Sequence, residues 1–165
     1  MNLISCVDSE WGIGYNNELL VKIPSDQKFF RSMTIGKVVV FGRKTIETFP
    51  GGKPLKDRTN IILTKSVNYE KKGEEIVCHS VEECLEELKK YPSEDIFICG
   101  GSSIYEQFLP YCDKAYITKI DRSFSKDSYF PNLDNDKNWK VTDEGEEQTY
   151  FDNTFSFVTY ERITE

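Results

Sequence analysis

Asp26 is the acidic side chain whose surroundings most favour chemistry, because apolar stretches flank it at residues 19–24 and at Phe29 and Phe30. A carboxylate in apolar surroundings can act as a general acid or base. It can equally stabilise the start of a helix by capping or by its charge. His79 is the only histidine, so a metal site built from several histidines is excluded and we expect none. The residues alone leave both roles of Asp26 open.

A second set of candidates has the chemistry to bind an anion at the ends of predicted strands. Gly100 and Gly101 lie between an apolar run and a helical segment, where the backbone can approach a diphosphate closely. Arg43, Lys44 and Lys65 also follow predicted strands. The alternatives are a tight turn for the glycines and solvated charge for the basic residues. A full G-x-G-x-x-G motif is absent, and Arg43 interrupts the order that a P-loop requires.

Three further side chains have ordinary interpretations as well as chemical ones. Arg58 precedes a predicted strand and is either a surface arginine or a bidentate clamp for a substrate carboxylate. On the residues alone, Thr118 is an ordinary strand threonine and Tyr105 an ordinary aromatic on a helix face.

Alternating strands and helices are predicted to position these residues. Short apolar, β-branched runs predict strands at residues 3–7, 37–42, 60–64, 96–99 and 115–120. Helices are predicted from Pro24, where a proline precedes an acid, from the capping box at residues 80–83 up to about residue 91, and at residues 102–109. Residues 139–142 and 155–163 are predicted to form an antiparallel pair of strands.

This order of elements predicts an α/β fold with one domain over residues 1–165. The expected sheet is open, twisted and mostly parallel, with an antiparallel C-terminal edge strand and helices on both faces. Ligands bind beyond the carboxyl ends of such strands. The loops to inspect therefore follow Val7, Gly42, Thr64, Cys99 and Ile120.

Composition excludes several functional classes. The 165 residues carry 28 acidic and 21 basic side chains, a net charge of −7, which argues against a nucleic-acid partner. No apolar run approaches the roughly 20 residues of a membrane span, and no secretory signal precedes the first strand. We therefore expect no membrane partner and a cytoplasmic location. The five cysteines are odd in number and form no C-x-x-C pair, so we expect free thiols.

Six segments in a fixed order make the chain closely similar to the dihydrofolate reductase family. They are residues 13–14, 23–26, 41–45, 58–64, 99–110 and 116–121, and the resemblance spans nearly the whole chain. Residues 127–131 also look like the D-x-x-F-P segment of the family, whose loop packs against the mobile first loop.

The resemblance implies NADPH-dependent reduction of 7,8-dihydrofolate to 5,6,7,8-tetrahydrofolate, with hydride transfer to C6 and protonation of N5. By that similarity, Asp26 hydrogen-bonds the amidine edge of the pterin and assists protonation, and Thr118 belongs to the same network. Arg58 binds the α-carboxylate of the substrate. We expect a monomer whose partner is this small-molecule substrate.

The resemblance also implies two sets of binding residues. The other substrate-binding residues are Ile4, Cys6, Gln27, Phe30, Thr48, Phe49 and Leu55. Arg43 and Lys65 lie nearest the 2′-phosphate of NADPH. The full cofactor set is Cys6, Ile13, Gly14, Asn17, Glu18, Leu19, Gly42, Arg43, Lys44, Thr45, Leu63, Thr64, Lys65, Cys99, Gly100, Gly101, Ser102, Ser103, Ile104, Tyr105 and Gln107.

The sequence departs from the common family pattern at two places. Most members carry proline and tryptophan just before the active-site helix, whereas this chain has Leu20 and Val21. Val21 has no indole N–H with which to hold a water near the pterin. Ser103 stands where an arginine often follows the glycine pair, so one phosphate contact must come from elsewhere.

Two other functions remain open on the residues. The pyrimidine reductase of riboflavin synthesis resembles this fold and uses NADPH, but it is not expected to combine residues 23–26 with Arg58. A nucleotide-binding module without catalysis would use the glycine pair and the basic residues while Asp26 only stabilises a helix.

Overall fold

The computed structural model describes residues 1–163 of the chain. Its strands are β1 (Asn2–Val7), β2 (Gly12–Tyr15), β3 (Glu18–Leu19), β4 (Val38–Gly42), β5 (Thr59–Leu63), β6 (Ile76–Cys78), β7 (Ile96–Ile98), β8 (Lys114–Ile120), β9 (Ser128–Tyr129), β10 (Trp139–Glu144), β11 (Gln148–Tyr150) and β12 (Asn153–Arg162). The α-helices are α1 (Pro24–Thr34), α2 (Arg43–Ile46), α3 (Val81–Leu88) and α4 (Ser102–Phe108). Short 3-10 turns lie at Pro50–Gly52, Ser93–Asp95, Leu109–Tyr111 and Leu133–Asn135.

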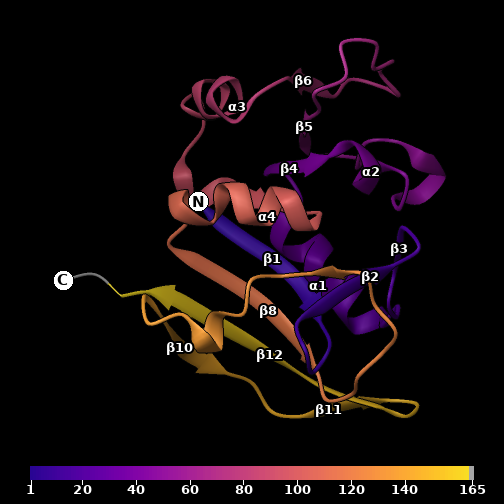
Figure 1. Cartoon of the computed structure of the whole chain (residues 1–165), viewed down its shortest axis with the longest axis vertical. Helices are drawn as coiled ribbons and strands as arrows, with labels where there is room; N and C mark the ends of the chain where they lie inside the picture. Colours follow the sequence, from indigo (N-terminus) through magenta and orange to yellow (C-terminus); the bar gives the residue numbers. More distant parts are fainter. Residues whose placement is uncertain (164–165) are drawn as a thin grey trace.

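Nine strands form the main sheet, in the order β10-β12-β8-β1-β7-β4-β5-β6, with β11 paired to β12 (Figure 1). The six strands from β8 to β6 pair in parallel. Strand β12 runs antiparallel to β8, and β10 runs antiparallel to β12. The prediction of a mostly parallel sheet with an antiparallel end is confirmed, although β12 is flanked by β10 and is not itself the outermost strand.

Side-chain alternation along the strands places helices on both faces of the sheet. In β4, Val38 and Val40 belong to the large core cluster that includes residues of α3 and α4. Val39 and Phe41, on the opposite face, pack with Ile46 of α2 instead. Because both faces of β4 are covered, its whole valine run is buried. The prediction of helices on both faces is therefore confirmed.

The predicted capping box holds the start of α3. The Ser80 side chain accepts a hydrogen bond of 3.0 Å from the backbone N–H of Glu83. The Glu83 carboxylate accepts from the backbone N–H of His79, at 3.0 Å, rather than from that of Ser80 itself. The helix ends at Leu88, before the predicted limit near residue 91.

The predicted elements omitted the shortest ones. Strands β2, β3 and β9 form a separate small sheet in the order β3-β2-β9. Strands β6 and β11 have three residues each, and helix α2 has four. Pairing with a distant strand stabilises such short strands, and it leaves no periodic pattern in the local sequence.

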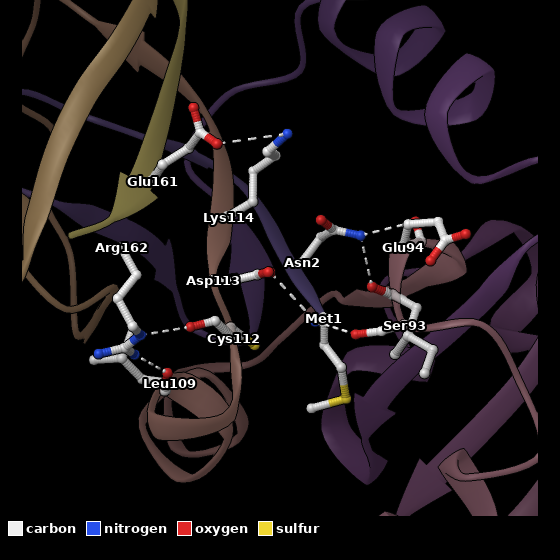
Figure 2. Close-up of polar contacts among 11 residues, drawn as sticks. Met1, Asn2, Ser93, Glu94, Leu109, Cys112, Asp113, Lys114, Glu161 and Arg162 are labelled. Atoms are coloured by element: carbon white, nitrogen blue, oxygen red, sulfur yellow. Dashed lines mark hydrogen bonds and ion pairs between the residues drawn. The ribbon is translucent and has the colours of Figure 1, made fainter. Parts of the chain in front are cut away.

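Polar contacts link several segments at the end of the sheet where β1 and β8 begin (Figure 2). The Asn2 side-chain amide donates to the carbonyl oxygen of Glu94 at 3.0 Å, just before β7. The Arg162 guanidinium donates to the carbonyl oxygens of Cys112 and Leu109, at 2.8 and 2.7 Å. These contacts connect the amino-terminal ends of the parallel strands to the end of β12. The carboxyl-terminal ends of the parallel strands, where ligands bind in such sheets, lie opposite.

The five cysteines, Cys6, Cys78, Cys84, Cys99 and Cys112, are all free thiols, as predicted. No helix within residues 1–163 combines the length and the apolar character needed to cross a membrane.

Candidate active site

A crevice opens where neighbouring parallel strands send the chain to opposite faces of the sheet. The chain leaves β1 toward α1 and leaves β7 toward α4, which packs with the core on the other face. Such a switch point binds ligands beyond the carboxyl ends of the strands. The carboxyl ends of β1, β4, β5 and β7 all contribute to this crevice.

The crevice contains a cavity of about 1250 Å³. Typical sites for one small ligand occupy roughly 300–1,000 Å³, so this cavity has room for two ligands side by side. Every residue assigned above to substrate or cofactor contributes to its wall. Thr118 does not, but it contacts Asp26, which does.

Asp26 and Thr118 form a hydrogen-bonded pair 92 residues apart in the sequence. The Thr118 hydroxyl donates to the Asp26 carboxylate at 2.6 Å, and Thr118 is only 1% exposed. No side-chain hydrogen bond caps α1, whose N-cap residue is Ile23. Capping therefore does not explain the position of Asp26, and its carboxylate is free to face the cavity.

Burial raises the pKa of Asp26, against the lowering effect of hydrogen bonds from Thr118 and Cys6. Cys6 and Thr118 are register partners on β1 and β8, so their side chains share the face that carries α1. Burial and the neighbouring Asp26 raise the pKa of the Cys6 thiol well above its usual range. Cys6 is therefore a protonated hydrogen-bond donor beside the carboxylate.

Replacing Thr118 by valine is expected to raise the pKa of Asp26 further. The hydroxyl donates to the ionised carboxylate, and a hydrogen bond to the charged form lowers a pKa. The titration of a ¹³C-labelled aspartate carboxyl, followed by NMR, should move to higher pH in Thr118→Val. Thr118→Ser keeps the hydroxyl and should titrate as the parent does. An identical titration in Thr118→Val would show that this hydrogen bond does not control the carboxylate.

Close backbone packing explains the glycines at the centre of the cavity wall. The backbone N–H of Gly42 donates to the carbonyl oxygen of Gly100 at 2.8 Å. A Cβ on Gly42 would lie 3.1 Å from Ile104, and one on Gly100 would lie 3.1 Å from the Tyr105 ring. Gly100 also has a φ of +113°, which side chains rarely adopt. The tight turn and the close approach are thus both present.

Tyr105 has a specific contact that its sequence position did not indicate. Its hydroxyl donates to the carbonyl oxygen of Ile4 at 2.7 Å, and the side chain is only 4% exposed. Burial raises its pKa, so the phenol remains protonated. The contact ties the start of α4 to β1 across the crevice.

A basic rim, defined here as Arg43, Lys44 and Lys65, lines one part of the cavity. All three side chains are exposed, and no carboxylate in residues 1–163 forms an ion pair with them. Helices α2 and α4 begin without side-chain caps, so their first backbone N–H groups are available to an anion. The rim and these N–H groups fit a phosphorylated ligand.

Arg58 lies at another part of the cavity and forms no ion pair with a carboxylate in the described chain. Its Nε donates to the carbonyl oxygen of Lys56 at 2.9 Å, and its Nη1 to the hydroxyl of Thr34 at 3.2 Å. Burial, followed by the charge of Arg31, lowers its pKa, yet an arginine stays charged at neutral pH. Neither Arg31 nor Arg58 forms an ion pair with a carboxylate within residues 1–163, so these two neighbouring guanidinium groups favour an anionic ligand.

The first loop crosses the cavity and is held from two sides. The Asn17 side-chain amide donates to the Glu47 carboxylate at 2.7 Å. The backbone N–H of Asn16 donates to the Asp127 carboxylate at 3.1 Å, and the N–H of Asp127 donates to the carbonyl oxygen of Gly14 at 2.9 Å. The expected packing of the D-x-x-F-P segment against the first loop is confirmed.

The base of this loop is anchored separately through Asp8, which is 1% exposed. Its carboxylate accepts from the backbone N–H groups of Glu10, Gly12 and Phe124 and forms an ion pair of 3.1 Å with Lys126. These bonds outweigh burial and lower the pKa of Asp8.

Several residues of the cavity wall were not predicted from the sequence, among them Arg31 and His79. Arg31 follows Asp26, Gln27 and Phe30 at helical spacing on α1, and that periodicity was a usable signal. His79 follows the carboxyl end of β6 and lies 2.8 Å from the carbonyl oxygen of Thr64. Strand β6 was not predicted, so the expectation that ligands bind beyond the carboxyl ends of the strands did not extend to His79.

Comparisons with known proteins agree on one family. The family model described as dihydrofolate reductase matches residues 1–162. The dihydrofolate reductase of Staphylococcus haemolyticus is 36% identical over 170 aligned residues, which cover 99% of this chain and 96% of that protein. The dihydrofolate reductase of Bacillus subtilis strain 168 is 32% identical over 164 residues, covering 98% and 94%.

A solved structure is similar over the same length. The dihydrofolate reductase from Enterococcus faecalis, complexed with NADP(H) and RAB-propyl, matches with a TM-score of 0.87 at 32% identity. The match covers 99% of this chain and 96% of that one.

Proposed function

The chain belongs to the dihydrofolate reductase family, and from this premise we propose a role for each group of residues along the cavity. The protein is an NADPH-dependent oxidoreductase that reduces 7,8-dihydrofolate to 5,6,7,8-tetrahydrofolate. When NADPH is bound, its nicotinamide supplies the hydride that C6 of the substrate accepts, while N5 takes up a proton. The residues of the chain must hold the nicotinamide ring against the pterin ring, exclude water from the site and promote protonation of N5.

Asp26 is the residue that binds and polarises the pterin. The observation that carries this assignment is the buried Thr118 hydroxyl, which donates to a carboxylate in the cavity wall at 2.6 Å. A carboxylate has about four acceptor sites, so capacity remains for N–H groups of the pterin. The negative charge of Asp26 favours protonation of the ring, and the proton reaches N5 from solvent.

Apolar side chains hold the rest of the substrate. Ile4, Phe30, Phe49 and Leu55 line the cavity from β1, α1 and the segment after α2. Val21 packs in the same apolar cluster as Cys6 and Ile23. With Val21 in place of tryptophan, this position supplies no indole N–H, so a water near the pterin must be held by other groups.

The cofactor lies along the other wall of the cavity. Its diphosphate is bound by the backbone N–H groups that follow Gly42 and Gly101, and its 2′-phosphate by Arg43 and Lys65. The uncapped helix starts and the unpaired basic rim support this placement. The first loop, held by Asn17 and Asp127, covers the nicotinamide.

Arg43→Ala and Lys65→Ala are each expected to weaken NADPH binding by roughly 3- to 10-fold. Charge-assisted bonds to phosphate are among the stronger hydrogen bonds, but both side chains are exposed and partly screened. NADH lacks the 2′-phosphate, so its affinity should change little. Fluorescence titration with both cofactors measures the two dissociation constants. Equal losses for NADPH and NADH would place the 2′-phosphate elsewhere.

We further propose a monomeric, single-domain protein of the cytoplasm that binds no nucleic acid. All the substrate-binding and cofactor-binding residues assigned above lie in one chain and line one cavity, which supports a monomer. Five free thiols suit a reducing compartment. The net charge of −7 opposes binding to a polyanion.

The decisive test is the fall of NADPH absorbance in the presence of dihydrofolate and the purified chain. Oxidation that requires dihydrofolate supports these assignments. Family membership over residues 1–162 favours this reaction over the pyrimidine reductase of riboflavin synthesis. A non-catalytic nucleotide-binding module would leave NADPH unoxidised.

A further inference from the structure

The Ser102 hydroxyl forms a hydrogen bond that has no part in the function proposed above. It donates to the carbonyl oxygen of Tyr129 at 2.7 Å, across 27 residues of the sequence. Ser102 is the first residue of α4, and Tyr129 is the last residue of β9. A hydroxyl has a single hydrogen to donate, so this bond uses the donor capacity of the side chain. The backbone N–H of Ser102 stays available to a ligand, because the first N–H groups of a helix have no partner within it.

Strand β9 in turn holds the first loop. It pairs antiparallel with β2, which belongs to that loop. The backbone N–H of Phe130 donates to the carbonyl oxygen of Trp11 at 2.8 Å, and the N–H of Asp127 donates to that of Gly14 at 2.9 Å. Amide hydrogens in such bonds exchange with solvent when the pairing opens. These two amides therefore report how firmly the first loop is held.

Aromatic packing joins α4 to the same segment. The rings of Tyr105 and Phe130 have their centroids 4.6 Å apart, and Phe130 also stacks on Trp11 at 5.9 Å. All three side chains are buried. The packing keeps the start of α4 beside β9, and the Ser102 bond adds a directional contact between the two segments. A continuous series of contacts thus runs from α4 through β9 to the first loop.

The start of α4 also faces the main cavity, where Gly101, Ser102 and Ser103 contribute to the wall. In the placement proposed above, the diphosphate of NADPH binds the backbone N–H groups that follow Gly101. Ser102 then has a ligand at its backbone and Tyr129 at its hydroxyl. A diphosphate that fixes the backbone of Ser102 also fixes the hydroxyl, which lowers the entropy lost when the bond to β9 forms. Occupation of the diphosphate site is thereby linked to the pairing of β9 with the first loop.

We propose that Ser102 is a positioning residue that couples the diphosphate site to the first loop, so that the cofactor tightens the loop before its nicotinamide is covered. The inference rests on the cofactor placement proposed above. One neutral hydrogen bond changes an equilibrium by roughly 2- to 12-fold, and the coupling cannot exceed the strength of the bond that transmits it. Because coupling is reciprocal, loss of the hydroxyl should weaken NADPH binding by a factor in the same range.

The test measures the exchange rates of the Phe130 and Asp127 amide hydrogens by NMR, with each of three ligands at saturation. Adenosine 2′-phosphate has no diphosphate. 2′-Phosphoadenosine 5′-diphosphate has the diphosphate but no nicotinamide, so its effect on the first loop must pass through the protein. NADPH carries both groups. Displacement of NADPH, followed by its fluorescence, shows whether each fragment occupies the cofactor site.

Four proteins are compared: the parent, Ser102→Ala, Ser102→Thr and Ser32→Ala. Ser102→Ala removes the hydroxyl and keeps the backbone N–H, whereas Ser102→Thr keeps both. Ser32→Ala is the matched control, because the Ser32 hydroxyl also donates to a backbone carbonyl oxygen, that of Phe29 at 2.8 Å, but within α1 and outside the main cavity. An effect of losing any serine hydroxyl would appear in this control as well.

We expect 2′-phosphoadenosine 5′-diphosphate to slow the exchange of both amides by roughly 2- to 12-fold in the parent, in Ser102→Thr and in Ser32→Ala. Adenosine 2′-phosphate should leave the exchange rates unchanged. In Ser102→Ala, neither fragment should slow the exchange. Equal slowing by the diphosphate fragment in Ser102→Ala and in the parent would overturn the inference, and so would the absence of any slowing in the parent.

Failure of the proposed function would give a different result. If 2′-phosphoadenosine 5′-diphosphate did not displace NADPH, the proposed cofactor placement would be contradicted, and the inference would fall with it. If the fragment displaced NADPH but left both amides unaffected in the parent, only the inference would be contradicted. Weaker binding of the fragment to Ser102→Ala, with the exchange rates of the parent at saturation, would assign the hydroxyl to the ligand alone and would overturn the coupling.

Discussion

Asp26→Asn is expected to lower the rate of dihydrofolate reduction at pH 7 by about 10²- to 10⁴-fold, the usual contribution of a general acid–base group. The variant keeps the shape of the side chain but loses the charge that favours protonation of N5. A higher proton concentration protonates the substrate without help from this charge, so the activity of the variant relative to the parent should recover as the pH falls. Rates from pH 5 to pH 8, with saturating NADPH, measure this recovery. Undiminished turnover at pH 7 would remove Asp26 from the mechanism.

Stability provides the control for this experiment. Because burial raises the pKa of Asp26 in the folded chain, the stability that Asp26 contributes is complete below its unfolded pKa and falls as the pH rises through the folded pKa. At pH 7 the ionised carboxylate therefore costs stability. Asp26→Asn should have a melting temperature at pH 7 equal to or above that of the parent, and unchanged NADPH affinity. These two measurements distinguish a variant that is inactive because it unfolds from one that is folded but catalytically impaired.

Arg58→Leu is expected to raise the KM for dihydrofolate by roughly 10- to 150-fold, the value of a charged hydrogen-bonded pair. In the proposed arrangement this contact lies far from the reacting ring, so it is expected to be equally strong in the ground state and the transition state. Its loss should therefore change kcat much less than KM. Steady-state kinetics with dihydrofolate gives both constants.

Two controls define the role of Arg58. A substrate truncated to the pterin has no carboxylate, so its KM should be the same in the parent and in Arg58→Leu. NADPH affinity should also be unchanged. If the truncated pterin binds more weakly to the variant, Arg58 acts through the shape of the cavity, which its hydrogen bond to Thr34 helps to hold, and the assigned orientation of the substrate is wrong.

The sequence predicted the parts of the fold that local pattern controls. The β-branched runs of β4 and β5 and the capping box of α3 are strong local signals, and the structure has those elements. Strands β2, β3 and β9 have two to four residues, too few for periodicity to appear. They exist because the first loop and the segment before Phe130 pair with each other.

The same distinction applies to the candidate site. Asp26 stood out locally because apolar residues surround it. Thr118 did not, since its importance comes from a bond across 92 residues, and only the resemblance to a family pointed to it. That Arg58 is basic is evident from the sequence, but only the structure shows that it forms no ion pair with a carboxylate among residues 1–163.

The polar contacts at the start of β1 and β8 make this chain suitable for engineering (Figure 2). Asn2 and Arg162 bond to backbone carbonyl groups at the edge of the sheet opposite the cavity. Neither residue lines the main cavity, so substitutions there are expected to change thermal stability without replacing a group that lines it. Enzymes often lose activity when they are made more robust, because the stabilising changes stiffen or relax the catalytic centre. In this chain, stabilising substitutions can be placed at the end of the sheet opposite the cavity. We expect them to raise stability without the usual loss of activity, because the cavity lies at the other end.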